Sequence, residues 1–173
     1  MMFQLVFGAF ICAYMMYSIY HSVVVVFKFK KNSKNFIILN SNVVKVQKGI
    51  LKCTLICLLS LVGFVMAIRV GMSSMTGKEL FVYRMTYIFM GIVFLGLAIE
   101  VLIKNTVYLS DSCFMYQDRI IKYRNILRIN NQKTFFNKKH FVIQNEEELS
   151  FSENLGVVIE HKYLEWKKLK HNK

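Results

Sequence analysis

A lysine-rich segment between two long uncharged runs constrains this chain more than any other feature. Residues 1–27 contain no charged side chain, and residues 53–68 contain none either. Between these runs, residues 28–52 carry seven lysines and no acidic residue. In membrane proteins, an excess of lysine and arginine marks the segments on the cytoplasmic side. The pattern therefore predicts an integral membrane protein in which residues 28–52 form a basic cytoplasmic loop.

The apolar runs predict three membrane-spanning helices, at about residues 3–26, 51–70 and 81–103. A hydrocarbon core of about 30 Å needs about 20 helical residues, so each run is long enough. With the lysine loop inside, the N-terminus and the short loop 71–80 lie outside, and the C-terminal segment lies inside. We expect a transmembrane domain at 1–103 and a cytoplasmic domain at 104–173.

The C-terminal segment has a different periodicity. Short runs with strand character alternate with turn residues, at 107–109, 113–116, 119–121, 126–130, 134–136, 140–144 and 148–151. Apolar residues then recur at three and four, as in an amphipathic helix, at Leu155, Ile159, Tyr163, Trp166 and Leu169. The expected fold class is an α+β membrane protein: three transmembrane helices, then one small antiparallel β-meander covered by a C-terminal helix. Residues 35–46 also have strand character and can extend that sheet.

Three short stretches carry a resemblance to a known group: AYMMYSIY at 13–20, FMY at 114–116 and IKYRNI at 121–126. Together with the layout, they resemble small bacterial three-span inner-membrane proteins of unknown function with a pleckstrin-homology-like cytoplasmic domain. The long lysine loop, with its own strand-like segment, departs from that group. The resemblance implies a multi-pass protein of the bacterial cell membrane, but no known reaction and no catalytic residues.

Two charged residues within the third predicted span are candidates for an intramembrane polar site. Glu100 is the one acid deep in a predicted span, and such acids are costly and often functional. It also precedes Lys104 by four residues, the favourable order for an ion pair on one helix. Arg84 lies near the outer end, where its side chain can reach the headgroups. Both readings of each residue stay open.

The lysines of the basic segment are the candidate surface for a lipid or a protein partner. The net charge of +13 is placed beside the apolar runs and not in one basic domain, so nucleic acid is not an expected partner. Anionic headgroups and an acidic protein both fit this charge. The residues are Lys28, Lys30, Lys31, Lys34, Lys45, Lys48 and Lys52.

No pattern in the sequence predicts catalysis, a metal or a cofactor. Cys53 and Cys57 share a helical face but lack further ligands at matched spacing. Five methionines gather towards the outer half of the second and third spans and fit either a Cu(I) site or apolar packing: Met66, Met72, Met75, Met85 and Met90. The four histidines have no ligand-like spacing, and nucleophile-elbow and phosphate-loop motifs are absent from the sequence.

These observations predict a non-enzymatic accessory or regulatory membrane protein. Its spans would dock on a membrane complex, as a transporter subunit or an immunity-type protein does, or on further copies of the chain. Its cytoplasmic domain would bind protein or anionic lipid. The alternatives are a small oligomeric ion or solute conduit that uses Glu100, and a ligand sensor that uses the β-domain.

Overall fold

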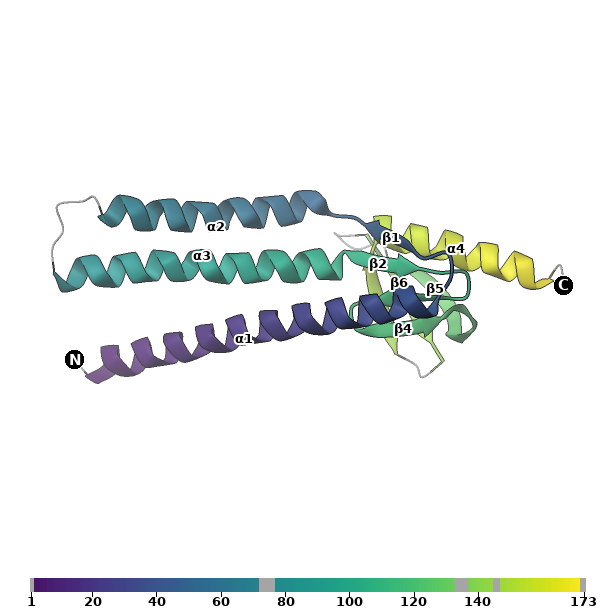
Figure 1. Cartoon of the computed structure of the whole chain (residues 1–173), viewed down its shortest axis with the longest axis horizontal. Helices are drawn as coiled ribbons and strands as arrows, with labels where there is room; N and C mark the ends of the chain where they lie inside the picture. Colours follow the sequence, from purple (N-terminus) through teal and green to yellow (C-terminus); the bar gives the residue numbers. More distant parts are fainter. Residues whose placement is uncertain (1, 72–76, 133–136, 145–146, 172–173) are drawn as a thin grey trace. The chain divides into compact units, whose positions relative to one another are not determined.

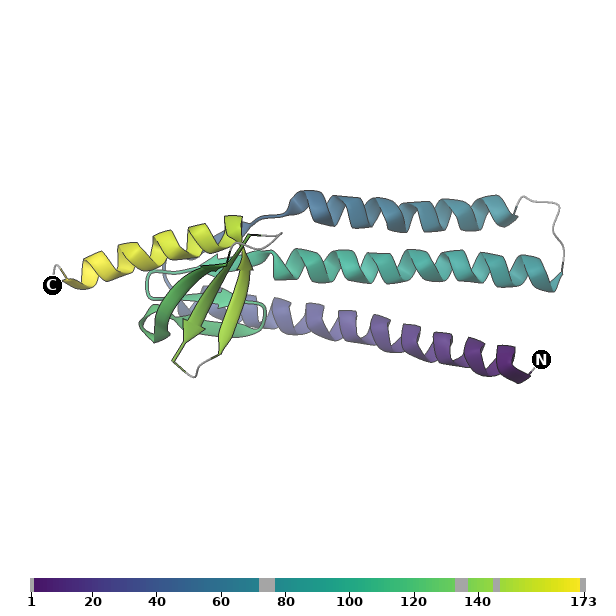
Figure 2. The same cartoon turned by 180° about the vertical axis from the view of Figure 1, so that it is seen from behind.

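A computed structural model describes residues 2–71, 77–132, 137–144 and 147–171 (Figures 1 and 2). For residues 2–12, 71, 132 and 171 it describes the backbone only. The elements follow the chain as α1 (Met2–Leu39), β1 (Val44–Gln47), α2 (Ile50–Gly71), α3 (Lys78–Lys104), β2 (Thr106–Leu109), β3 (Cys113–Tyr116), β4 (Arg119–Lys122), a 3₁₀ turn (Tyr123–Asn125), β5 (Ile126–Gln132), β6 (Lys138–Ile143), β7 (Glu148–Ser152) and α4 (Glu153–His171).

The chain divides into two compact units. The first, which we call the helical unit, comprises Met1–Phe27 and Gly49–Leu102. The second, the sheet unit, comprises Lys28–Lys48 and Ile103–Lys173. Residues 28–48 therefore belong to the sheet unit. The chain passes from one unit to the other three times.

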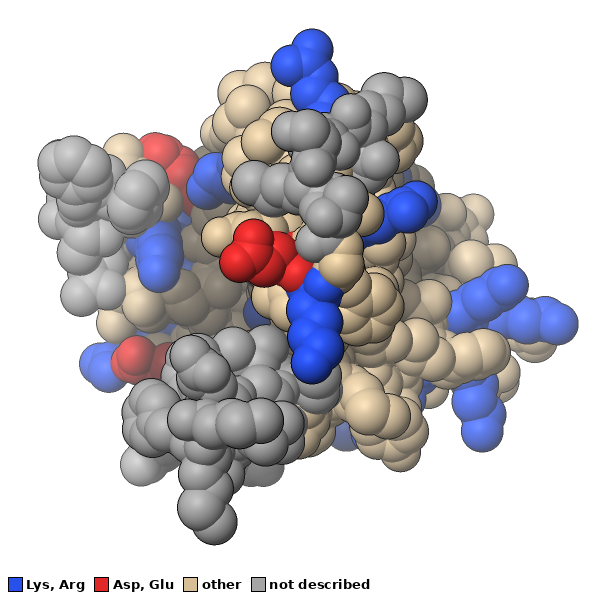
Figure 3. All heavy atoms as spheres, turned by 90° about the vertical axis from the view of Figure 1, so that its left-hand side faces the viewer, with Lys and Arg blue, Asp and Glu red and all other residues tan. Residues whose placement is uncertain are grey.

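In the helical unit, α2 and α3 run side by side and are apolar enough to cross a membrane (Figure 1). Their spanning stretches, Ile50–Val70 and Lys78–Lys104, both have a mean hydropathy of 2.3. Only 17% of the most apolar stretch of each helix is buried, so most of this apolar surface faces outward. Figure 3 views the chain from the left-hand side of Figure 1, and blue Lys and Arg side chains are more frequent there than red Asp and Glu side chains. The segment predicted as a first span, 3–26, is helical within α1, but the described residues do not show it to be a third span.

The structure of residues 28–39 differs from the loop that the sequence predicted. They are the end of α1 and not a loop, and the expected strand at 35–46 is reduced to β1. Phe29, Ser33 and Phe36 recur at helical spacing on one side of the helix. Phe29 and the fully buried Phe36 pack with residues of β2 and β3, and Ser33 is buried as well. This packing outweighs the strand preference of the sequence FIIL at 36–39. The helix ends at Leu39, and the side chain of the next residue, Asn40, donates to the Phe36 carbonyl oxygen at 2.9 Å.

The strands form two antiparallel sheets and not the single sheet expected from the sequence. The first has the order β1-β2-β3-β4, and the second has the order β5-β6-β7. The 3₁₀ turn at Tyr123–Asn125 separates them. Because the Tyr123 side chain is buried in the core, the chain leaves the first sheet here and β5 does not form a hairpin with β4. The expected strand at 134–136 lies outside the described residues. β1 pairs with β2, so the lysine-rich segment does add a strand to the first sheet.

The first sheet is covered on both faces, which explains why all of β2 is buried. On one face, Tyr108 and Met115 pack against Phe36 of α1. On the other face, Val107 and Phe114 meet the second sheet and α4 in the main core. The α4 stripe predicted from the sequence takes part in that core as far as Trp166, while Leu169 beyond it is 67% exposed.

Candidate functional site

A polar cluster joins α1 to α3 within the helical unit. The Ser22 hydroxyl donates to Oε1 of Glu100 at 3.1 Å, and Nδ1 of His21 lies 3.3 Å from the same oxygen. The Glu100 side chain is only 17% exposed, whereas that of His21 is 52% exposed. A partly buried carboxylate needs hydrogen-bond donors to offset its desolvation, and α1 supplies them. The cluster can therefore hold two helices together.

Sequence reasoning identified Glu100 but missed its partners on another helix. The available signal was that His21 and Ser22 are polar residues inside an apolar run. Arg84, the other predicted intramembrane residue, is exposed on the same helix as Glu100. The two are sixteen residues apart, or about 24 Å along a helix with a rise of 1.5 Å per residue. They do not belong to one site.

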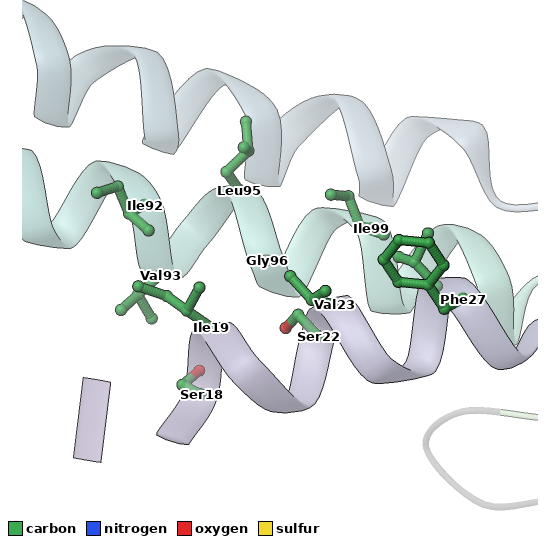
Figure 4. Close-up of a pocket in the computed structure, with 11 residues that line it drawn as sticks. Ser18, Ile19, Ser22, Val23, Phe27, Ile92, Val93, Leu95, Gly96 and Ile99 are labelled. Carbon is green, nitrogen blue, oxygen red and sulfur yellow. The ribbon is translucent and has the colours of Figure 1, made fainter. Parts of the chain in front are cut away.

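A cavity of about 290 Å³ lies between α1 and α3 in the helical unit (Figure 4). The side chains that line it on α1 lie between Ser18 and Phe27, and those on α3 lie between Ile92 and Ile99. Gly96 lies at the point where the two helices approach, since a Cβ atom there would be 2.9 Å from the Ser22 Oγ. Apart from the hydroxyls of Ser18 and Ser22, every side chain that lines the cavity is apolar. No sequence pattern indicates this cavity, because it depends on which helix faces are neighbours.

The predicted basic surface is exposed but is not a single cluster. On α1, Lys31 and Lys34 lie opposite Phe29 and Phe36, which pack on the first sheet, whereas Lys28 and Lys30 lie towards the two sides of the helix. Lys45 lies on the edge strand β1, and Lys52 is on α2 in the helical unit. Within the described part of the chain, none of the first six lysines of the set forms an ion pair: Lys28, Lys30, Lys31, Lys34, Lys45 and Lys48. The first acidic residue of the chain is Glu79, so no acidic residue lies near these lysines in the sequence.

The cysteines considered as candidate ligands make contacts within the fold. The Cys53 Sγ contacts the Ala98 carbonyl oxygen at 3.5 Å, and the buried Cys113 Sγ contacts Oδ1 of Asn40 at 3.2 Å. Among the described residues, no group of three or more histidine, cysteine or acidic side chains is arranged to hold a metal ion. Met72 and Met75 lie outside the described residues.

No family model, curated protein or solved structure matches this chain. The interpretation of the cluster, the cavity and the basic face therefore rests on their geometry.

Proposed function

We propose that this chain is a non-enzymatic integral membrane accessory protein, with the sheet unit at the cytoplasmic surface and the start of α1 as a third span. The observation that carries the proposal is the position of lysines at the three passages between the units. Lys28 and Lys48 are the first and last residues of one sheet-unit segment, and Lys104 is the second residue of the other. Lysines concentrated at the ends of apolar helices fit a cytoplasmic membrane surface with anionic lipids.

The outward surface of α2 and α3 supports insertion into a membrane. Large apolar side chains along both helices are more than half exposed, for example Leu58, Leu61 and Phe81. In water, a continuous apolar surface of this kind would promote aggregation, whereas in a bilayer it is in contact with hydrocarbon.

The sheet unit supports a recognition role. Two antiparallel sheets and the C-terminal helix α4 share one core in this unit, which gives the exposed lysines of α1 and β1 a folded support. The basic face of α1 in this unit offers charge to an acidic protein surface or to anionic headgroups. A membrane complex that the spans dock on would bring such a surface close to these lysines.

A conduit centred on Glu100 receives less support. The Glu100 carboxylate meets Ser22 and His21, and the cavity beside this contact is lined by apolar side chains. An ion pathway needs polar groups or water along its length, so we assign the cluster to helix association.

Purification of the tagged full-length protein from its native membranes in mild detergent tests the proposal. We expect one membrane protein to co-purify in a fixed ratio, and the double variant Lys30→Gln/Lys34→Gln to lower that ratio. The matched control is Lys167→Gln/Lys168→Gln, which removes two exposed lysines from α4 instead. Recovery of the chain alone, without a partner and without self-association, would contradict the docking role.

A further inference from the structure

The cavity between α1 and α3 is an elongated hollow that opens to the surroundings of the helical unit. Along α1 it extends from Ser18 to Phe27, which corresponds to about 14 Å at a rise of 1.5 Å per residue. Its rim is exposed: the fractional exposure is 46% for Val23, 70% for Phe27 and 48% for Leu95. A ligand can therefore enter from the side of the helices, where α2 and α3 also expose apolar surface.

The shape and lining of the cavity restrict what can occupy it. Water is a poor occupant, because a site needs several polar partners to hold it. The Ser22 hydroxyl already donates to Glu100, which leaves Ser18 as the other polar side chain in the lining. An inserted helix is too large, since a cylinder about 10 Å across and 14 Å long occupies roughly 1,000 Å³, against a cavity of about 290 Å³. A single side chain from a partner would fill only about one turn of its length.

We propose that this cavity is a binding site for one acyl chain of a bilayer phospholipid. The site rests on the proposed membrane location of the helical unit, and it goes beyond it by naming a resident ligand. A narrow, flexible hydrocarbon chain matches both the volume and the length of the hollow. It supplies packing contacts to the apolar side chains of α1 and α3 that line the hollow.

Lipid retention by the full-length protein tests the site. The protein is purified in mild detergent, stripped of lipid and mixed with palmitoyl-oleoyl phosphatidylglycerol, and bound lipid is counted by native mass spectrometry. Val93→Phe places a ring in the cavity, and Ser18→Leu fills it from α1 should the first variant fail to fold. Val62→Phe is the matched control, because Val62 is exposed on α2 and does not line the cavity.

We expect the wild type and Val62→Phe to retain one phospholipid, and Val93→Phe or Ser18→Leu to lose it. Equal retention by all folded variants, or no retention by the wild type, overturns the proposal. Self-association that Val93→Phe abolishes, without retained lipid, would assign the cavity to a side chain of a second copy and overturns it as well. Resistance of every variant to alkaline extraction from membranes separates this failure from a failure of the proposed membrane location.

Discussion

At the scale of single residues, Tyr123 connects β3, α4 and the turn at Ser110 in the core of the sheet unit. Its side chain is fully buried, and its hydroxyl donates to the Ser110 carbonyl oxygen at 3.2 Å. Its ring lies 5.9 Å from that of Phe114 and 6.1 Å from that of Trp166, measured between centroids. Burial raises the pKa of the Tyr123 phenol, and the neighbouring acid groups of Cys113 and Asp111 raise it further. The folded protein therefore keeps this phenol protonated at a pH where an unfolded chain ionises it.

This difference makes the stability of the sheet unit depend on alkaline pH. An unfolded tyrosine has a pKa of about 10, so its contribution is complete below pH 10 and is lost as the pH rises towards the folded pKa. Over that range Tyr123 lowers the free energy of unfolding by about 1.4 kcal/mol per pH unit. We expect Tyr123→Phe to remove this part of the slope and to cost about 1 kcal/mol below pH 10, through the lost hydrogen bond.

Urea unfolding of the full-length protein in detergent, followed by Trp166 fluorescence, measures this effect. Trp166 is the one tryptophan of the chain and packs against the main core of the sheet unit. Tyr83→Phe, an exposed position on α3, controls for the substitution itself. Parallel stability curves for the wild type and Tyr123→Phe above pH 10 would show that another group carries the dependence.

At the scale of elements, short-range sequence patterns predicted the helices and strands whose formation depends on neighbouring residues. Turn residues located β2, β3 and β4, and the period of Leu155 and Ile159 located α4, because these segments each bury one continuous stripe or pair with a sequence neighbour. Residues 36–39 were misassigned because the sheet surface that Phe36 contacts comes from a distant part of the chain. For the same reason, Glu100 was found in the sequence, while His21 and the cavity needed the arrangement of α1 beside α3.

The contact between α2 and α3 depends on glycine at one position. A Cβ atom at Gly63 would lie 2.9 Å from the Gly91 nitrogen and 3.1 Å from the Tyr87 carbonyl oxygen. These are backbone atoms, so the helices themselves must move apart. The same contact holds the hydrogen bond from the Ser60 hydroxyl to the Gly91 carbonyl oxygen at 2.7 Å.

We therefore expect Gly63→Val to destabilise the α2–α3 pair by roughly 1–3 kcal/mol, as overpacking does. Ser60→Ala, which removes only the hydrogen bond, is expected to cost about 1 kcal/mol. Loss of helical circular dichroism during titration with a denaturing detergent measures both. Leu61→Ala, at a site that is 59% exposed, serves as the control. A Gly63→Val protein as stable as this control would show that α2 and α3 do not approach so closely.

At the scale of the whole molecule, the charge distribution and the division into units agree on a topology. Along the chain, α2 begins just after one passage from the sheet unit and α3 ends at a passage back into it, and the two helices run side by side as a hairpin (Figure 1). Residues 104–173 carry 13 basic and 8 acidic residues, so the second sheet-unit segment is basic like the first. The segment between α2 and α3, residues 72–77, carries no charged residue, and α3 begins with Lys78 followed by Glu79. This asymmetry predicts that the sheet unit is cytoplasmic and that the start of α3 is outside.

Labelling of single cysteines in intact cells with an impermeant maleimide tests this topology. Lys45→Cys on β1, Lys168→Cys on α4 and Lys78→Cys at the start of α3 all place the thiol at exposed positions. Cys12, Cys53 and Cys57 are replaced by alanine, and Cys113 stays because it is only 5% exposed. We expect Lys78→Cys to react in intact cells, and the other two to react only after permeabilisation.

The reverse pattern would invert the orientation but keep the hairpin, whereas reaction of Lys45→Cys and Lys78→Cys from the same side would show that α2 does not span. Lysines at all three passages make the first outcome the expected one, because the inverted protein would hold its basic surface away from the anionic leaflet.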